Sequence, residues 1–200
     1  MRAAALALAV AGVLAGCGPG AGPDAEATGP GRSPTVAAAR DTCVAGDVEA
    51  GLAGIEAAGA RGADAHVAQA FCHWIRFDET GDDADGEAAQ AALTKALAEA
   101  RADGAGPAAL ARIYSHRAAL RRARGGPWPV TLADLDAAVE GDTLQPLYVL
   151  DRAVARARQG DSAAAVRDFD RYLALDTLDA ARADFARRFR DEVQPRRAAP

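Results

Sequence analysis

The chain has 200 residues, a formal net charge of −5 and 50% hydrophobic residues, but only 5% of its residues are aromatic. Because a net acidic chain has no basic field that attracts phosphate groups, nucleic acid is not an expected partner. Alanine dominates the apolar residues and β-branched residues are sparse, which favours closely packed helices over β-sheet. We therefore expect an all-α protein.

The N-terminal segment 1–16 has the organisation of a secretory signal peptide. A single positive charge at Arg2 precedes an apolar run from Ala3 to Val13. At about 1.5 Å per helical residue this run is too short to span a hydrocarbon core of roughly 30 Å. We expect residues 1–16 to be an export signal rather than a transmembrane helix.

The segment Leu14-Ala15-Gly16-Cys17 resembles the lipobox of bacterial lipoproteins. The resemblance implies cleavage before Cys17 and diacylation of its thiol, and two acyl chains suffice for stable anchoring. It also implies an extracytoplasmic location, either in the periplasm or on the cell surface. The membrane that holds the anchor would be the cell membrane or the outer membrane. The alternative is an ordinary signal peptide in which Cys17 has no special role.

The expected domain organisation follows from composition. Residues 17–34 contain the lipidated cysteine and then mainly Gly, Pro and Ala, so we expect a flexible linker there. Residues 35–193 are long enough for one helical domain with its own core, and residues 194–200 are expected to be a disordered tail.

Apolar periodicity and turn residues predict the helices of this domain. We expect them near residues 35–45, 47–60, 65–78, 87–103, 107–124, 132–140, 144–158, 162–175 and 178–192. The acidic segment 78–87 is interpreted as a solvated loop, because Gly81 and Ala92 would occupy obligatory ligand positions of a calcium loop. Thr131 to Asp134 resembles a capping box, and Trp128 between two prolines is expected in a loop.

Two pairs of segments in the second half resemble each other. Tyr114–Gly126 matches Val149–Asp161, and Leu132–Val139 matches Val166–Leu173 after a slip of one position. Self-similarity at a period of about 34 residues is typical of helical repeat proteins. We expect two helices in each repeated unit.

The segment Asp151–Thr177 is similar to a tetratricopeptide repeat (TPR). The similarity rests on three features. Ala153 is the small residue of the first helix, Gly160 and Asp161 form the turn, and the packing face of the second helix contains Ala165, Phe169, Tyr172 and Leu173. Tyr172 and Thr177 depart from the alanine and proline usual in the family. The resemblance implies a right-handed solenoid of stacked helical hairpins. An irregular, Ala-rich helical bundle is the alternative.

TPR geometry implies a partner-binding groove on the first helices of the last two units. The residues expected in it are Arg112, Ser115, Arg122, Leu147, Leu150, Val154 and Arg158. Arginines in such a groove would bind a carboxylate bidentately. The charged end of the chain, from Arg182 to Arg197, is interpreted as a solvated capping helix with a frayed tail.

Catalytic and metal sites are not expected. The sequence has none of the common nucleophile, zinc-protease or nucleotide-binding motifs. His66 and His73 lie two helical turns apart, roughly 10 Å along the axis, which is too far for a shared zinc ion without further ligands. Trp74 is interpreted as a core residue. We expect no cofactor and no small-molecule substrate.

The two resemblances together imply a membrane-anchored, non-enzymatic adaptor that binds a protein or peptide of the bacterial cell envelope. A structural or assembly lipoprotein without a peptide-binding groove is the main alternative, and a cell-wall enzyme or its accessory is a weaker one. A groove binder should have a concave surface lined by the first helices, whereas an enzyme should have a deep pocket with convergent ionisable groups. Affinity capture from solubilised envelopes is the experiment that would identify the partner.

A disulfide between Cys43 and Cys72 is possible. If Cys17 carries lipid, these two remain as a pair in a compartment where thiols oxidise. Adjacent helices about 8 to 10 Å apart can bring the Cα atoms within the roughly 7 Å that bridging requires. Two buried free thiols are the alternative.

Overall fold

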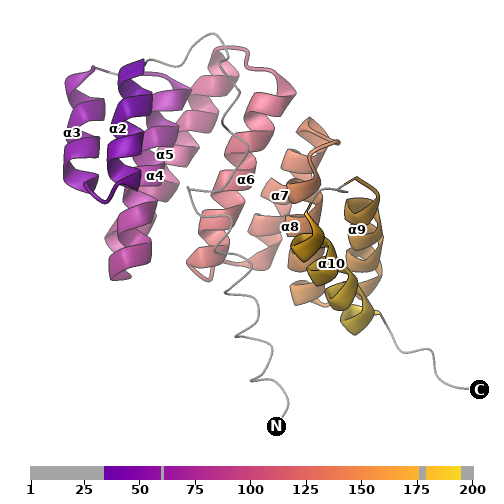
Figure 1. Cartoon of the computed structure of the whole chain (residues 1–200). Coiled ribbons are helices and arrows are strands. Elements are labelled where there is room, and N and C mark those ends of the chain that lie inside the picture. Colours follow the sequence, from indigo (N-terminus) through magenta and orange to yellow (C-terminus); the bar gives the residue numbers. More distant parts are fainter. Residues whose placement is uncertain (1–33, 60, 176–178, 195–200) are drawn as a thin grey trace, which may run out of the picture. The chain divides into compact units, whose positions relative to one another are not determined.

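The computed structural model describes residues 34–59, 61–175 and 179–194, and the regular structure of these residues is entirely helical (Figure 1). The all-α prediction is confirmed for this part of the chain. Its helices are α2 (Pro34–Val44), α3 (Val48–Ala57), α4 (Ala63–Thr80), α5 (Asp83–Ala102), α6 (Pro107–Ala123), α7 (Trp128–Gly141), α8 (Pro146–Gln159), α9 (Ser162–Leu175) and α10 (Ala180–Val193). The signal peptide, Cys17, most of the linker, Thr177 and the tail after Gln194 lie outside the described residues.

The acidic segment 78–87 is not a loop, and that prediction was wrong. Helix α4 continues to Thr80 and ends at Gly81, whose φ of 71° is readily adopted only by glycine. Helix α5 begins at Asp83, and the carboxylate of Asp82 accepts a hydrogen bond from the backbone N–H of Ala84 (3.0 Å). Acidic residues in a first turn interact favourably with the helix dipole, which explains why this segment tolerates helix formation.

The capping box at Thr131 and the loop position of Trp128 were also wrong. Trp128 is the first residue of α7, where a neighbouring proline is compatible with the first helical turn. Thr131 lies inside the helix, is 1% exposed, and its hydroxyl donates to the carbonyl of Pro127 (3.3 Å). Asp134 does not cap the helix because two arginines of α6 bind its carboxylate.

The chain divides within α5, between Ala96 and Leu97, into two compact units. In the first unit, α2, α3 and α4 pack on one another around a shared apolar cluster. The cluster consists of Val36, Ala39, Cys43, Val48, Ile55, Ala65, Ala68 and Cys72, with Leu52 and Ile75 against it. Its side chains are small, so the helices approach closely.

In the second unit each helix from α6 to α9 packs on the next one along the chain. Ala118, Leu135 and Ala155 form a buried cluster, against which Trp128 packs. At the other end, Phe169 of α9 contacts Phe189 of α10 edge to face, with ring centroids 5.8 Å apart. The second unit therefore contains large aromatic core residues.

From α7 onward the helix positions repeat at one interval, whereas the interval from α6 to α8 is longer. Helix α7 covers 128–141 and α9 covers 162–175, while α8 covers 146–159 and α10 covers 180–193. The interval from α7 to α9 therefore equals the interval from α8 to α10, both at the helix starts and at the helix ends. This spacing agrees with the similarity between the sequence segments 132–139 and 166–173.

Candidate partner-binding surface

A network of arginines and aspartates connects the helices of the second unit. We call it the Arg–Asp ladder, and it comprises Arg117, Arg121, Asp134, Asp136, Arg152, Arg156 and Asp168. Asp134 on α7 is 3% exposed and accepts hydrogen bonds from Arg117 (2.6 and 2.9 Å) and from Arg121, both on α6. Bidentate guanidinium–carboxylate pairs of this kind are both strong and geometrically specific.

The same arrangement recurs one repeat later. Asp168 on α9 is 4% exposed and binds Arg152 (2.8 and 2.9 Å) and Arg156 (2.9 Å), both on α8. In the matched segments of the sequence, Asp168 is the equivalent of Asp134, and the two arginines of α8 are the equivalents of the two on α6. The first helix of each hairpin therefore contributes two arginines, one turn apart, to a buried carboxylate of the second.

A second set of ion pairs connects successive hairpins. Asp136 on α7 accepts hydrogen bonds from Arg152 and Arg156 on α8, each at 3.0 Å. Asp170, its equivalent on α9, pairs with Arg190 on α10 at 3.0 Å. Asp136 and Asp170 thus make ionic contacts between hairpins that repeat with the same period as the helices.

Burial and the paired carboxylates shift the pKa values of the ladder arginines in opposite directions: burial lowers the pKa of Arg152, but its pairs with Asp168 and Asp136 raise it further, so the net shift is upward. Burial lowers the pKa of the Arg121 guanidinium, and the positive charge of Arg117 acts in the same direction, while Asp134 opposes both. Two cations share one carboxylate here, so removal of the carboxylate would leave both without compensation. Loss of one ladder carboxylate should therefore destabilise the unit.

The structure separates the predicted groove residues into distinct environments. Leu150 and Val154, which were expected in the groove, are 7% and 2% exposed and therefore offer a partner little surface. Both belong to the apolar face with which α8 packs against its neighbours. Arg112, Ser115 and Leu147 are half-buried, and Arg158 is exposed.

Arg122 is engaged within the chain rather than directed to a partner. Its guanidinium lies 2.9 Å from the carboxylate of Asp151 on α8, and both side chains are mostly buried. Charge reversal at Arg122 would place two carboxylates together, so a variant there would report on stability as well as on binding. Arg158 is the predicted groove arginine with an exposed side chain.

Tyr114 on α6 lies between two cations. The guanidinium carbons of Arg101 and Arg117 each lie 5.6 Å from the centre of its ring, and Arg101 also donates to its hydroxyl. Cation–π contacts of this kind hold an aromatic ring in a fixed orientation. Tyr114 therefore links the C-terminal end of α5 to the ladder.

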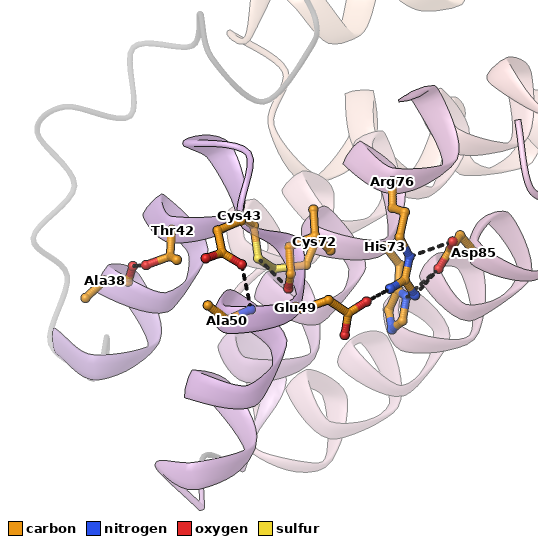
Figure 2. The surroundings of a disulfide bond; sticks show 11 residues. Ala38, Thr42, Cys43, Glu49, Ala50, Cys72, His73, Arg76 and Asp85 are labelled. Atoms are coloured by element: carbon orange, nitrogen blue, oxygen red, sulfur yellow. Dashed lines mark hydrogen bonds and ion pairs between the residues drawn. A yellow bond between two sulfur atoms is a disulfide. The ribbon is translucent and has the colours of Figure 1, made fainter. Parts of the chain in front are cut away.

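The first unit contains a smaller polar network (Figure 2). Arg76 on α4 donates to the buried carboxylate of Asp85 on α5 (2.7 Å) and to Glu49 on α3, and His73 lies 3.0 Å from Asp85. Hydrogen bonds from Arg76 lower the pKa of Asp85; burial raises it, and the hydrogen bond with His73 again lowers it. His73 is thus engaged with a carboxylate.

Cys43 and Cys72 form a disulfide in the structure (Figure 2). The bond joins α2 to α4, with the Cα atoms 5.3 Å apart, and both residues are fully buried. Gly51 on α3 makes this approach possible, because a Cβ atom there would lie 2.0 Å from the sulfur of Cys43.

Sequence reasoning missed the ladder, although its signal was present. The matched segments at 132–139 and 166–173 each contain two aspartates separated by one residue, and the matched helices before them each contain arginines four positions apart. Arginines four apart share a helix face, so the pattern predicts a shared acceptor. The partners themselves follow only from the packing of the helices.

The first unit contains a small cavity. Val36, Ala37, Arg40, Asp64, Val67 and Ala68 line a cavity of about 30 Å³, which has room for one water molecule. Among the described residues, no three side chains of His, Cys, Asp or Glu are grouped as metal ligands. None of the described helices combines the length and apolarity needed to cross a bilayer.

Comparisons with protein-family models, with curated proteins and with solved structures find no match for this chain.

Proposed function

We propose that the chain is a lipid-anchored, TPR-like adaptor of the bacterial cell envelope that binds a protein or peptide and has no catalytic activity. The observation that supports it most is the repeat period, which the helix bounds and the ladder aspartates share. TPR proteins repeat a pair of helices with a period of about 34 residues, and their stacked hairpins typically bind other proteins.

The binding surface that we propose lies on α6 and α8, the first helices of two successive hairpins. Arg158 is its exposed cation, and Arg112, Ser115 and Leu147 are half-buried beside the core. Leu147 and Arg158 lie near opposite ends of α8, so the surface would bind an extended peptide along the helix, with a carboxylate of the peptide at Arg158.

Capture of the partner tests this surface. The anchored protein would be crosslinked in intact cells, solubilised and purified, and the captured proteins compared between the parent and Arg158→Glu. Arg167→Glu on α9 is the matched control, because it reverses an exposed arginine on a second helix of the same unit. We expect Arg158→Glu to lose a partner that Arg167→Glu retains. Equal capture by both variants would exclude α8 as the binding surface.

The anchor is tested separately. Cys17→Ser should abolish labelling by a fatty acid analogue and leave either uncleaved precursor or soluble protein, because the thiol is the group that the lipobox resemblance implies is acylated. A variant at Cys43 is a poor control because it breaks the disulfide, so Ser33→Ala in the linker serves instead. Unchanged labelling of Cys17→Ser would refute the lipid anchor.

A second function has support from specific observations. Leu150 and Val154 are buried, and all four ladder arginines are bound to aspartates of the same chain. These features suit a structural or assembly lipoprotein without a peptide groove. Under this alternative, crosslinking would capture the same proteins from the parent and from both arginine variants.

A further inference from the structure

A covalent bond connects the helical hairpin formed by α2 and α3 to α4. The Cys43–Cys72 disulfide joins α2 to α4 across a sequence separation of 29, and the whole of α3 lies within the loop that it closes. The bond therefore restrains both helices of the hairpin formed by α2 and α3.

The apolar contacts that hold this hairpin are small. Of the buried residues that α2 and α3 contribute to the cluster, Ile55 has the largest side chain, and the others are valine, alanine and cysteine. No aromatic residue occurs between residues 34 and 57. Because the free energy of burial scales with apolar area, this cluster contributes less than the aromatic core around Phe169 and Phe189.

Helix α3 is also weak by itself. It has 10 residues, and two of them are glycines, Gly51 and Gly54. Glycine in a helix interior is unfavourable relative to alanine, and a helix of this length is unstable unless it packs on other elements. The ion pair between α3 and α4 joins Arg76 to Glu49, whose side chain is 80% exposed, and exposed pairs contribute little.

We propose that the Cys43–Cys72 bond is a redox latch. When the bond is present, α2 and α3 are docked on α4; when it is reduced, the hairpin undocks while α7 to α10 remain folded. Closure transfers two electrons and two protons from the two thiols to a small-molecule disulfide, which becomes two thiols, and a dithiol reductant reverses the step. Closure starts from the undocked hairpin, in which the thiols are accessible. Because both sulfur atoms are buried when the bond is present, reduction requires a transient local opening of the helices around the intact bond. This inference is independent of the proposed adaptor function.

Hydrogen–deuterium exchange of the full chain tests the latch. With Cys17→Ser, Cys43 and Cys72 are the only cysteines left, so the state of the bond is defined. Three forms are compared: the oxidised chain, the same chain after unfolding and refolding in a phosphine reductant, and the double variant Cys43→Ala, Cys72→Ala. We expect amides of residues 34–57 to exchange on the order of 100-fold faster in both forms that lack the bond, and those of 128–193 to be unchanged.

One control and two refuting outcomes complete the test. Reoxidation of the reduced chain with glutathione disulfide should restore slow exchange in residues 34–57, which separates loss of the bond from irreversible damage. Equal protection of 34–57 in the oxidised and reduced chains would overturn the proposal, because apolar contacts alone would then suffice. Loss of protection across 128–193 as well would also overturn it, because the bond would then support the whole described chain instead of one hairpin.

Discussion

Removal of one buried carboxylate of the ladder, by Asp168→Ala, should destabilise the second unit strongly. Asp168 is 4% exposed and accepts three hydrogen bonds from Arg152 and Arg156. Removing one partner of a buried ion pair typically costs about 3 to 5 kcal/mol, because the remaining charge has no compensation. Both arginines keep Asp136, which is partly exposed, so we expect the lower end of that range, about 3 kcal/mol.

Tryptophan fluorescence can isolate the unit concerned. The chain has two tryptophans, and in a Trp74→Phe background the remaining one, Trp128, packs in the cluster of the second unit. Urea unfolding followed at Trp128 would give the free energy of unfolding of Asp168→Ala and of its parent.

The control is an aspartate in an exposed pair. Asp184 pairs with Arg187 on the surface of α10, so Asp184→Ala should change the free energy of unfolding by less than about 1 kcal/mol. If Asp168→Ala is also within about 1 kcal/mol of its parent, the ladder does not stabilise this unit and the argument from burial is wrong.

Three further predictions concern the first unit. Gly51→Ala should destabilise it by about 1 to 3 kcal/mol, because the new Cβ would lie 2.0 Å from the sulfur of Cys43. Gly54→Ala should change the free energy of unfolding less, because its new Cβ would lie 3.2 Å from the Cβ of Ala39, a tight contact that a small shift relieves. Urea titration of both variants checks this. Thiol counting on the denatured, unreduced Cys17→Ser chain should find no alkylatable cysteine, and two would refute the disulfide. Hydrogen bonds from Arg76 hold the pKa of Asp85 below its usual value of 3.8. The ionised Asp85 should therefore stabilise the protein fully above about pH 4, and this contribution should disappear as the pH falls through the lowered pKa. Asp85→Asn should be less stable than the parent at pH 7 and should lose less stability on acidification, and parallel curves of stability against pH would contradict this.

The sequence alone predicted the helices because their determinants are local. Alanine-rich segments favour helix at any position, and the turn at Gly160 was predicted from the residue that most readily adopts the φ of 89° found there. The period of the second unit was also visible, since equivalent helices contain equivalent residues. The errors at the start of α5 and of α7 arose where charges and prolines, usually read as loop signals, are compatible with a first turn.

The tertiary structure decided which side chains meet. Asp134 was predicted to cap its own helix, but it lies inside α7 and binds arginines of α6. Leu150 and Val154 were predicted on an open groove, but they are buried. Helical periodicity defines which residues share a face, but the rotation of each helix against its neighbours decides whether that face is buried, paired or exposed. That rotation depends on the packing of side chains from segments well separated in the sequence, for which local propensity carries no information.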